Sequence, residues 1–179
     1  NAETIARAYT DTAANLAAAF DGITTSTSTL GISGTTPATI AELMTINAAT
    51  IGNVVLNAET IAENYDDTAA NLAMAFDGIT TSAATLTITD GTPAGTIAEL
   101  MTINAATSGN VVLNAETNAA AYSDTAANLI TAFTGTAAHT GTLLVSNTDI
   151  VFAADLKLID TFSSSDIIVS SASEISGSA

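Results

Sequence analysis

The sequence contains no cysteine and no tryptophan, and only two of its 179 residues are lysine or arginine. Without cysteine, the chain can form no disulfide, no thiolate metal site and no thiol nucleophile. Two basic residues cannot neutralise a run of phosphates, so we expect no nucleic-acid partner. They also provide little attraction to an anionic membrane surface. These absences leave a strongly acidic chain with a net charge of −16.

Long hydrophobic runs are missing as well, although 47% of the residues are hydrophobic. Much of this content is alanine, and no segment approaches the roughly 18 uninterrupted apolar residues of a membrane helix, so we expect no membrane insertion. The chain opens Asn1-Ala2-Glu3-Thr4, without a methionine or a basic segment before an apolar one. This indicates a processed protein or a piece of a longer chain. The acidic, cysteine-free composition favours a secreted, extracellular or cell-surface location.

The dominant pattern is internal repetition with a period of 56 or 57 residues. The copies are marked by an Asn-Ala-Glu-Thr motif, which starts at Asn1, Asn57 and Asn114. We expect residues 1–56 to form repeat 1, residues 57–113 repeat 2, and residues 114–169 a repeat 3 whose second half is degenerate. Residues 170–179 are a serine-rich tail. The whole chain is predicted to form one continuous structural domain.

Each repeat carries two strand patterns. Val54–Leu56 and Val111–Leu113 are short β-branched runs after Gly-Asn, which predicts a turn followed by a strand. Thr85–Thr89 alternates between polar and apolar residues, as a half-buried strand does, and its counterparts are Thr29–Ser33 and Thr142–Ser146.

Each repeat also carries two helix patterns. The first helix is predicted to begin at an aspartate N-cap, which is Asp11, Asp67 or Asp124 in the three copies. The second is predicted to begin at Thr39 or Thr96 and to end in the usual glycine-terminated manner at Gly52 or Gly109. The Asn-Ala-Glu-Thr motif ahead of the first helix predicts an additional short turn of helix.

Strands that alternate with helices favour parallel pairing through right-handed crossovers. We therefore predict an α/β fold, a repeat solenoid of parallel strands and helices with about two strand–helix units per repeat. A solenoid is favoured because near-identical copies require near-identical surroundings. A doubly wound sheet is the alternative.

Two motifs occur in a fixed order along the chain. Asp-Thr-Ala-Ala-Asn-Leu is followed by Thr-Ile-Ala-Glu-Leu-x-x-Ile-Asn-Ala-Ala-Thr, which occupies Thr39–Thr50 and Thr96–Thr107. This order resembles repeats of very long exported surface proteins of bacteria and cyanobacteria, many of them adhesin-like, over most of residues 1–170. The resemblance implies an extracellular or surface protein and no enzyme. The Gly-Gly-x-Gly-x-Asp repeats of calcium-binding β-rolls are absent, so this resemblance does not imply calcium through that motif.

The candidate metal ligands are four aspartates whose oxygens suit Ca²⁺: Asp66, Asp67, Asp77 and Asp90. Their spacing matches no calcium-binding loop, so helix capping and solvated loops are the favoured interpretation. We expect no cofactor, with Ca²⁺ as the alternative. His139 is the only histidine and has the chemistry for a Ser-His-Asp arrangement. The other copies have serines at its place, so we expect an exposed loop residue.

Several polar residues recur in register and are expected to be structural. Aligned asparagines are predicted either to form a ladder to the backbone of the next unit or to bond helix ends; these are Asn15, Asn71, Asn128, Asn47 and Asn104. The tyrosines Tyr9, Tyr65 and Tyr122 are expected to pack as a column with solvated hydroxyls, which leaves glycan or cell-surface binding open.

The end of repeat 3 is richer in bulky residues than the other copies. We predict that it contacts the first unit of another subunit through Phe152, Leu156, Leu158, Ile159 and Phe162. Head-to-tail contact that does not close produces a filament. The expected function is therefore that of a polymeric homo-oligomer: a structural subunit of an extracellular filament, surface layer or appendage, and no enzyme. The alternative is a spacer or ligand-binding segment of a giant secreted adhesin, with calcium dependence as a variant.

Overall fold

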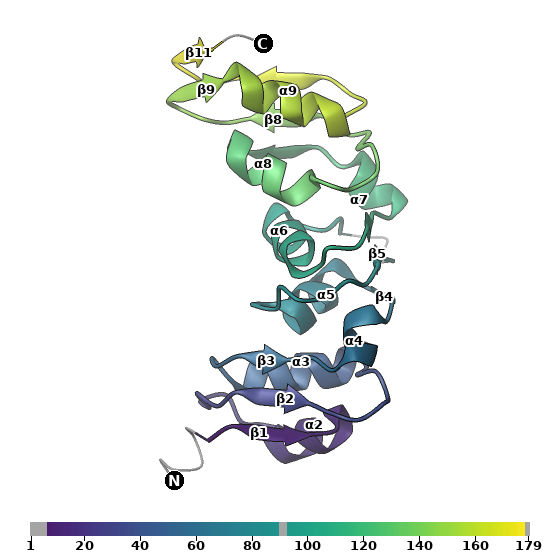
Figure 1. Cartoon of the computed structure of the whole chain (residues 1–179). Helices are drawn as coiled ribbons and strands as arrows, with labels where there is room; N and C mark the ends of the chain where they lie inside the picture. The colour runs from purple at the N-terminus through teal and green to yellow at the C-terminus, as the bar shows by residue number, and fades with distance from the viewer. Residues whose placement is uncertain (1–6, 90–92, 178–179) are drawn as a thin grey trace.

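The computed structural model describes residues 7–89 and 93–177, in which eleven strands alternate with eight helices (Figure 1). Every strand pairing in this part of the chain is parallel, so the predicted combination of parallel strands and helices is confirmed. In chain order the elements are β1 (Tyr9–Asp11), α2 (Ala13–Phe20), β2 (Leu30–Ile32), α3 (Ile40–Ala49), β3 (Val54–Val55), α4 (Ala58–Ala62), β4 (Tyr65–Asp67), α5 (Ala69–Phe76), β5 (Leu86–Ile88), α6 (Ile97–Ala106), β6 (Val111–Val112), α7 (Ala115–Ala119), β7 (Tyr122–Asp124), α8 (Ala126–Phe133), β8 (Leu143–Val145), β9 (Ile150–Phe152), α9 (Ala153–Phe162), β10 (Ile167–Val169) and β11 (Glu174–Ser176).

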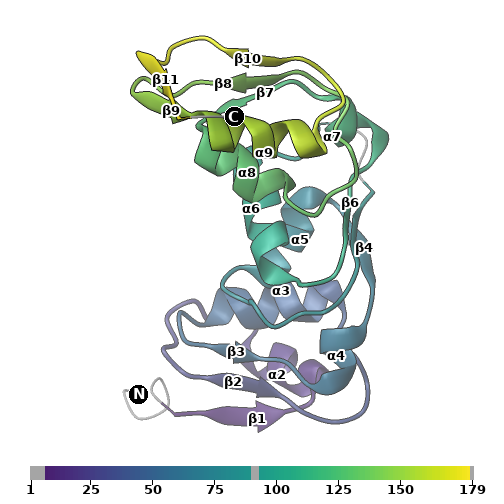
Figure 2. The same ribbon diagram turned by 45° about the horizontal axis from the view of Figure 1, so that its top comes forward.

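Six helices each combine with a preceding strand to form what we call the first to sixth units: β1–α2, β2–α3, β4–α5, β5–α6, β7–α8 and β8–α9. The helices of consecutive units pack against one another, from α2 through α3, α5, α6 and α8 to α9. This helix row runs along the molecule with α2 at one end and α9 at the other (Figure 1). The short helices α4 and α7 lie beside the row (Figure 2). Among the described helices, none has the length and apolarity needed to cross a membrane.

The strands form several small sheets. Three of them contain three strands each, in the orders β1-β2-β3, β4-β5-β6 and β7-β8-β10, and β9 pairs with β11. After β3 and β6 the chain enters the short helices α4 and α7, and the next strand belongs to a new sheet. The helix row therefore continues across points where the strand pairing is interrupted.

The prediction of two strands per repeat is wrong, because a third strand lies just before the first helix. Its segments, β1, β4 and β7, pair in register with β2, β5 and β8. In repeat 2 this strand has the sequence Tyr-Asp-Asp, which has low strand propensity and no apolar run. Pairing of Tyr65 with Leu86 and of Asp67 with Ile88 across the sheet, and not local preference, makes this segment extended.

The core lies between the helix row and the sheets. Each central strand directs alternate residues inward: Leu30 and Ile32 of β2 are buried and Gly31 is less so, as the alternation predicted. The helices contribute Leu16, Leu72 and Leu129 at equivalent positions. A tyrosine packs edge-on or tilted against a phenylalanine in each repeat, with ring centroids 5.3–5.4 Å apart.

The first-helix N-caps are threonines and not the predicted aspartates. The Thr12 hydroxyl accepts a hydrogen bond from the backbone N–H of Asn15, and Thr68 and Thr125 do the same in the other copies. Asp11 lies one residue earlier, at the end of β1, where its carboxylate accepts from the Thr12 N–H at 2.7 Å. The second-helix caps at Thr39 and Thr96 are confirmed, and both complete a capping box with a glutamate three residues later.

Gly52 and Gly109 have a different role from the predicted helix ending. The second helices end before them, at Ala49 and Ala106, and neither glycine has a positive φ. A Cβ at Gly52 would collide with the backbone oxygen of Ser28 in the preceding unit. These glycines are therefore required for close approach between the backbones of successive units.

Candidate functional site

One set of polar contacts joins each repeat to the next. The Tyr65 hydroxyl donates to the backbone oxygen of Ala38 at 2.8 Å, and the Ala38 N–H donates to the Thr60 hydroxyl at 2.9 Å. Both partners come from the segment α4–β4, which follows the helix that Ala38 precedes. The backbone of Ala38 is thus held on both sides by side chains 22 and 27 residues further on.

Repeat 3 makes the same pair of contacts on repeat 2. The Tyr122 hydroxyl donates to the Gly95 oxygen at 2.6 Å, and the Gly95 N–H donates to Thr117 at 3.0 Å. The predicted solvated hydroxyls are therefore wrong for these two tyrosines. Burial raises the pKa of Tyr65 to about 12, because the ionised phenolate would lose its hydration.

A second type of contact joins α3 to α5 and α6 to α8. The Asn47 side-chain amide donates to the Met74 oxygen at 3.0 Å and to the Asp77 oxygen at 2.9 Å. Asn104 donates to the Thr131 oxygen at 2.7 Å. These acceptors lie in the last turn of the next helix or at its C-cap, where carbonyl groups lack helical partners. These two asparagines therefore bond the backbone of the following unit.

The other three aligned asparagines bond within their own unit. Asn15 donates to the Asp11 carboxylate at 2.8 Å, and the same bond joins Asn71 to Asp67 and Asn128 to Asp124. Of the two predicted alternatives, these residues therefore take the bond at a helix end and not the ladder. The Asn15 bond, together with the Thr12 N–H, lowers the pKa of Asp11.

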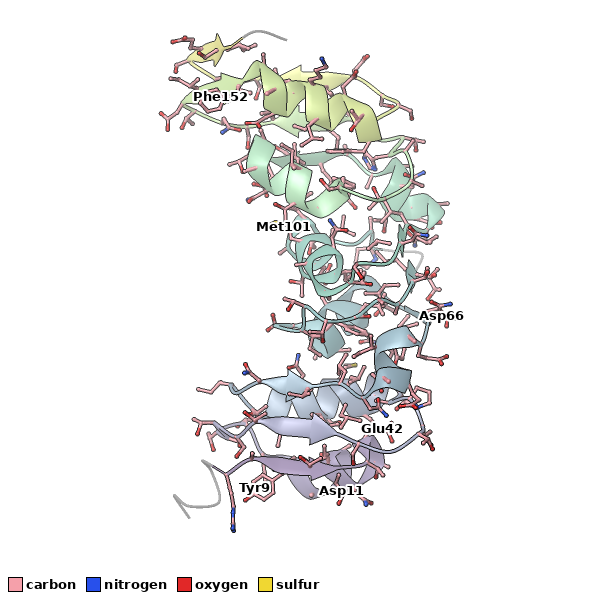
Figure 3. The ribbon with its side chains drawn as sticks, in the orientation of Figure 1. Tyr9, Asp11, Glu42, Asp66, Met101 and Phe152 are labelled. Carbon is pink, nitrogen blue, oxygen red and sulfur yellow. The ribbon has the colours of Figure 1, made fainter. Side chains whose placement is uncertain are left out.

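The first unit exposes a face that equivalent units bury. Ala75 and Ala132 are fully buried in α5 and α8, whereas their counterpart Ala19 in α2 is exposed. Ile79 is 4% exposed and its counterpart Ile23 is 39% exposed. Figure 3 shows β1, which carries Tyr9 and Asp11, at the extreme end of the molecule. We call the surface around Ala19 and Ile23 the first-unit face.

The sixth unit exposes a groove at the opposite end of the molecule. It has a volume of about 490 Å³ and is lined by Ala153, Leu156, Lys157, Asp160, Ile167 and Val169. Leu156 is the counterpart of Leu43 and Leu100, which are completely buried in helices that pack against a following helix. This groove, which we call the sixth-unit groove, therefore occupies the place where α3 and α6 receive a following unit.

The residues predicted to contact another subunit divide into two groups. Ile159 and Phe162 are buried in the core, so the prediction is wrong for these two. Phe162 stacks on Phe133 of α8, with ring centroids 6.0 Å apart. Phe152 is 56% exposed and Leu158 is 42% exposed, and Leu156 lines the sixth-unit groove.

The three candidate metal ligands within the described residues do not form a site. Asp66 is exposed on β4 and Asp77 is the exposed C-cap of α5, while the Asp67 carboxylate accepts from Asn71 and from the Thr68 N–H. Asp90 lies outside the described residues. Within residues 7–89 and 93–177, no group of three or more His, Asp or Glu side chains is arranged to hold a metal ion.

His139 is completely buried, so the predicted exposed loop residue is wrong. Its ring packs against Phe133 and Tyr122, with centroids 4.7 and 5.5 Å apart, and its Nε2 lies 3.1 Å from the Ala120 oxygen. Burial lowers the pKa of His139, so the ring is neutral at pH 7. Local composition predicts exposure of this loop because it does not reveal that the backbone of His139 pairs with Ser163 of the next unit.

The sequence patterns did not predict the two hydrogen bonds by which Thr60 and Tyr65 bind the backbone of Ala38. A signal for them was present, because threonine and tyrosine recur five residues apart in every copy. Only the docked repeats show that both side chains reach the same backbone position. Neither a scan of protein families nor searches of curated proteins and of solved structures give a match to this chain.

Proposed function

We propose that this chain is a structural rod segment of a secreted or cell-surface protein, a solenoid in which each strand–helix unit docks on the one before it. The observation that carries the proposal is the recurrence of the same contacts between units. Tyr65 and Tyr122 bond equivalent backbone oxygens of the preceding repeat, and Asn47 and Asn104 bond equivalent helix ends of the following unit. Repeated interfaces of this kind make a chain stiff along one direction.

The composition supports an extracellular role for such a rod. Its stability rests on apolar burial and hydrogen bonds and needs no disulfide, since the chain has no cysteine. A net charge of −16 keeps neighbouring rods apart in solution. The resemblance to repeats of long exported surface proteins agrees with this location.

The decisive experiment lengthens the chain by one repeat. A second copy of residues 57–113 inserted after Leu113 keeps the repeats in phase. We expect small-angle scattering to show a longer rod with an unchanged cross-section, and thermal unfolding to occur at a higher temperature, because each added unit contributes another interface. A matched control inserts a glycine- and serine-rich segment of the same length, which should add no stability. An inserted repeat that unfolds separately from the rest would contradict the rod.

A head-to-tail filament is the second candidate, and the exposed first-unit face together with the sixth-unit groove favours it. Electron microscopy over a range of protein concentrations separates the two functions. Rods of one length at all concentrations support the rod segment, whereas fibres that lengthen with concentration support the filament. Repeating the microscopy with and without a calcium chelator tests the calcium-dependent form of the adhesin alternative. For the rod segment we expect the same length in both conditions.

A further inference from the structure

The eighth residue of the helices α3, α6 and α9 differs in a way that bears on docking. It is asparagine in α3 and α6, as Asn47 and Asn104, and aspartate in α9, as Asp160. In α3 and α6 its amide donates to carbonyl oxygens at the end of the next helix. A carboxylate at the same place accepts hydrogen bonds but donates none at neutral pH.

A second copy that docked on the sixth-unit groove in the same geometry would bring its α2 there. The carbonyls equivalent to those of Met74 and Asp77 are then those of Ala18 and Asp21, at the end of α2. Asp160 would place its negative charge against these oxygens and near the carboxylate of Asp21. An acceptor that faces acceptors is repelled, and burying it unpaired adds a desolvation cost.

A second substitution in α9 acts in the same direction. The fifth helix position is Met44 in α3 and Met101 in α6, which pack partly buried against the core. In α9 it is Lys157, which is exposed and lines the sixth-unit groove beside Asp160. A docking helix would remove water from this ammonium group at the place where α3 and α6 pack a methionine side chain, and this desolvation costs free energy.

We propose that the eighth helix position is the specificity determinant of docking between units. Asparagine at this position lets a further unit dock, and Asp160, assisted by Lys157, prevents the sixth-unit groove from receiving the first-unit face of a second copy. This inference rests on the proposed docking of units in a rod.

The test converts α9 into a helix of the α6 kind in the full chain, with the double variant D160N/K157M. Sedimentation velocity and electron microscopy are run on this variant, on the wild type and on D149N, which removes an exposed negative charge that does not line the groove. We expect the wild type and D149N to remain single rods. The double variant should associate end to end, roughly 100-fold more tightly than the wild type.

A further substitution shows which surfaces meet. Ala19→Arg on the exposed side of α2 should return the double variant to single rods, because the larger side chain blocks the first-unit face. Two results would overturn the inference: a double variant that stays a single rod while its unfolding temperature matches that of the wild type, or a wild type that already associates and is dispersed by Ala19→Arg. Neither result affects the repeat-insertion test of the rod, so the two proposals fail separately.

Discussion

The fourth and sixth units contain helices of equal length, α6 and α9. Within the described residues, α6 packs between the helices α5 and α8, whereas α9 packs against α8 and has no helix on its other side. The α6 helix begins with a capping box of Thr96 and Glu99, and its Asn104 bonds the next helix. The α9 helix begins after Phe152 without a side-chain cap, and Asp160 takes the place of the asparagine. In a chain of near-identical copies, the residues at which one copy departs therefore mark the positions where its surroundings differ.

The largest expected effect compares the two leucines at the fourth position of these helices. Leu100→Ala should lower the free energy of unfolding by about 2–5 kcal/mol, because Leu100 is completely buried and leaves a cavity. Leu156→Ala should cost about 1 kcal/mol, since Leu156 borders the open groove and solvent can fill the space. Denaturant unfolding measures both. Equal losses would show that the groove is covered in solution.

The next effect exchanges the residues at the docking position. Asn104→Asp should cost about 1–3 kcal/mol, because the carboxylate would face the Thr131 oxygen that the amide now bonds. The reverse change, Asp160→Asn, should alter the stability of the single chain by less than about 0.5 kcal/mol, as at an ordinary exposed site. An Asn104→Asp variant as stable as the wild type would remove the reason for treating this position as special.

The third comparison is between His139 and the serines at its place, Ser26 and Ser82. The pKa of His139 in the folded chain lies below its usual 6.5, so the unfolded chain binds the proton more readily. The resulting stability is fully present above pH 6.5 and is lost as the pH falls below 6.5 through the lower pKa of the folded chain. We expect His139→Ser to reduce the loss of stability between pH 7 and pH 5. The measurement is the slope of the unfolding free energy against pH, which a cavity left by the smaller side chain does not alter.

The smallest expected effect concerns the helix caps. Thr96→Ala should cost about 1 kcal/mol, because the capping box of α6 is lost. Phe152→Thr should stabilise α9 by about 0.5 kcal/mol by supplying the missing cap, with Phe152→Ala as the control for loss of the exposed ring. Thermal unfolding measures the stability of the three variants relative to the wild type. A Phe152→Thr variant no more stable than Phe152→Ala would mean that the end of β9 cannot adopt a capping geometry.

Local sequence patterns predicted those features whose causes lie within a few residues. The capping boxes at Thr39 and Thr96 need only a threonine followed by a glutamate three residues later. The central strand β5 followed from the alternation of Thr85–Thr89. The aspartate caps were misassigned by one residue, because Asp11 and Thr12 are both good capping residues and the strand ending at Asp11 was not foreseen.

In the candidate site too, contacts within a few residues differ from contacts between units in how far a local pattern predicts them. Asn15 and Asn47 have the same side chain, yet Asn15 bonds an aspartate four residues earlier and Asn47 bonds carbonyls 27 and 30 residues later. No local pattern distinguishes these two outcomes. The predicted subunit contact at the end of repeat 3 included Ile159 and Phe162, which are buried in the core.

The sequence by itself determined the number and phase of the repeats, the alternation of helices with parallel strands and the caps of the second helices, because each depends on neighbouring residues or on simple repetition. Tertiary structure alone decided that Tyr65–Asp67 is a strand, that His139 is buried, and that Thr60 and Tyr65 hold the backbone of Ala38. In these cases the stabilising partner lies in another unit, more than 18 residues away. Which groups meet across that separation depends on how the units dock.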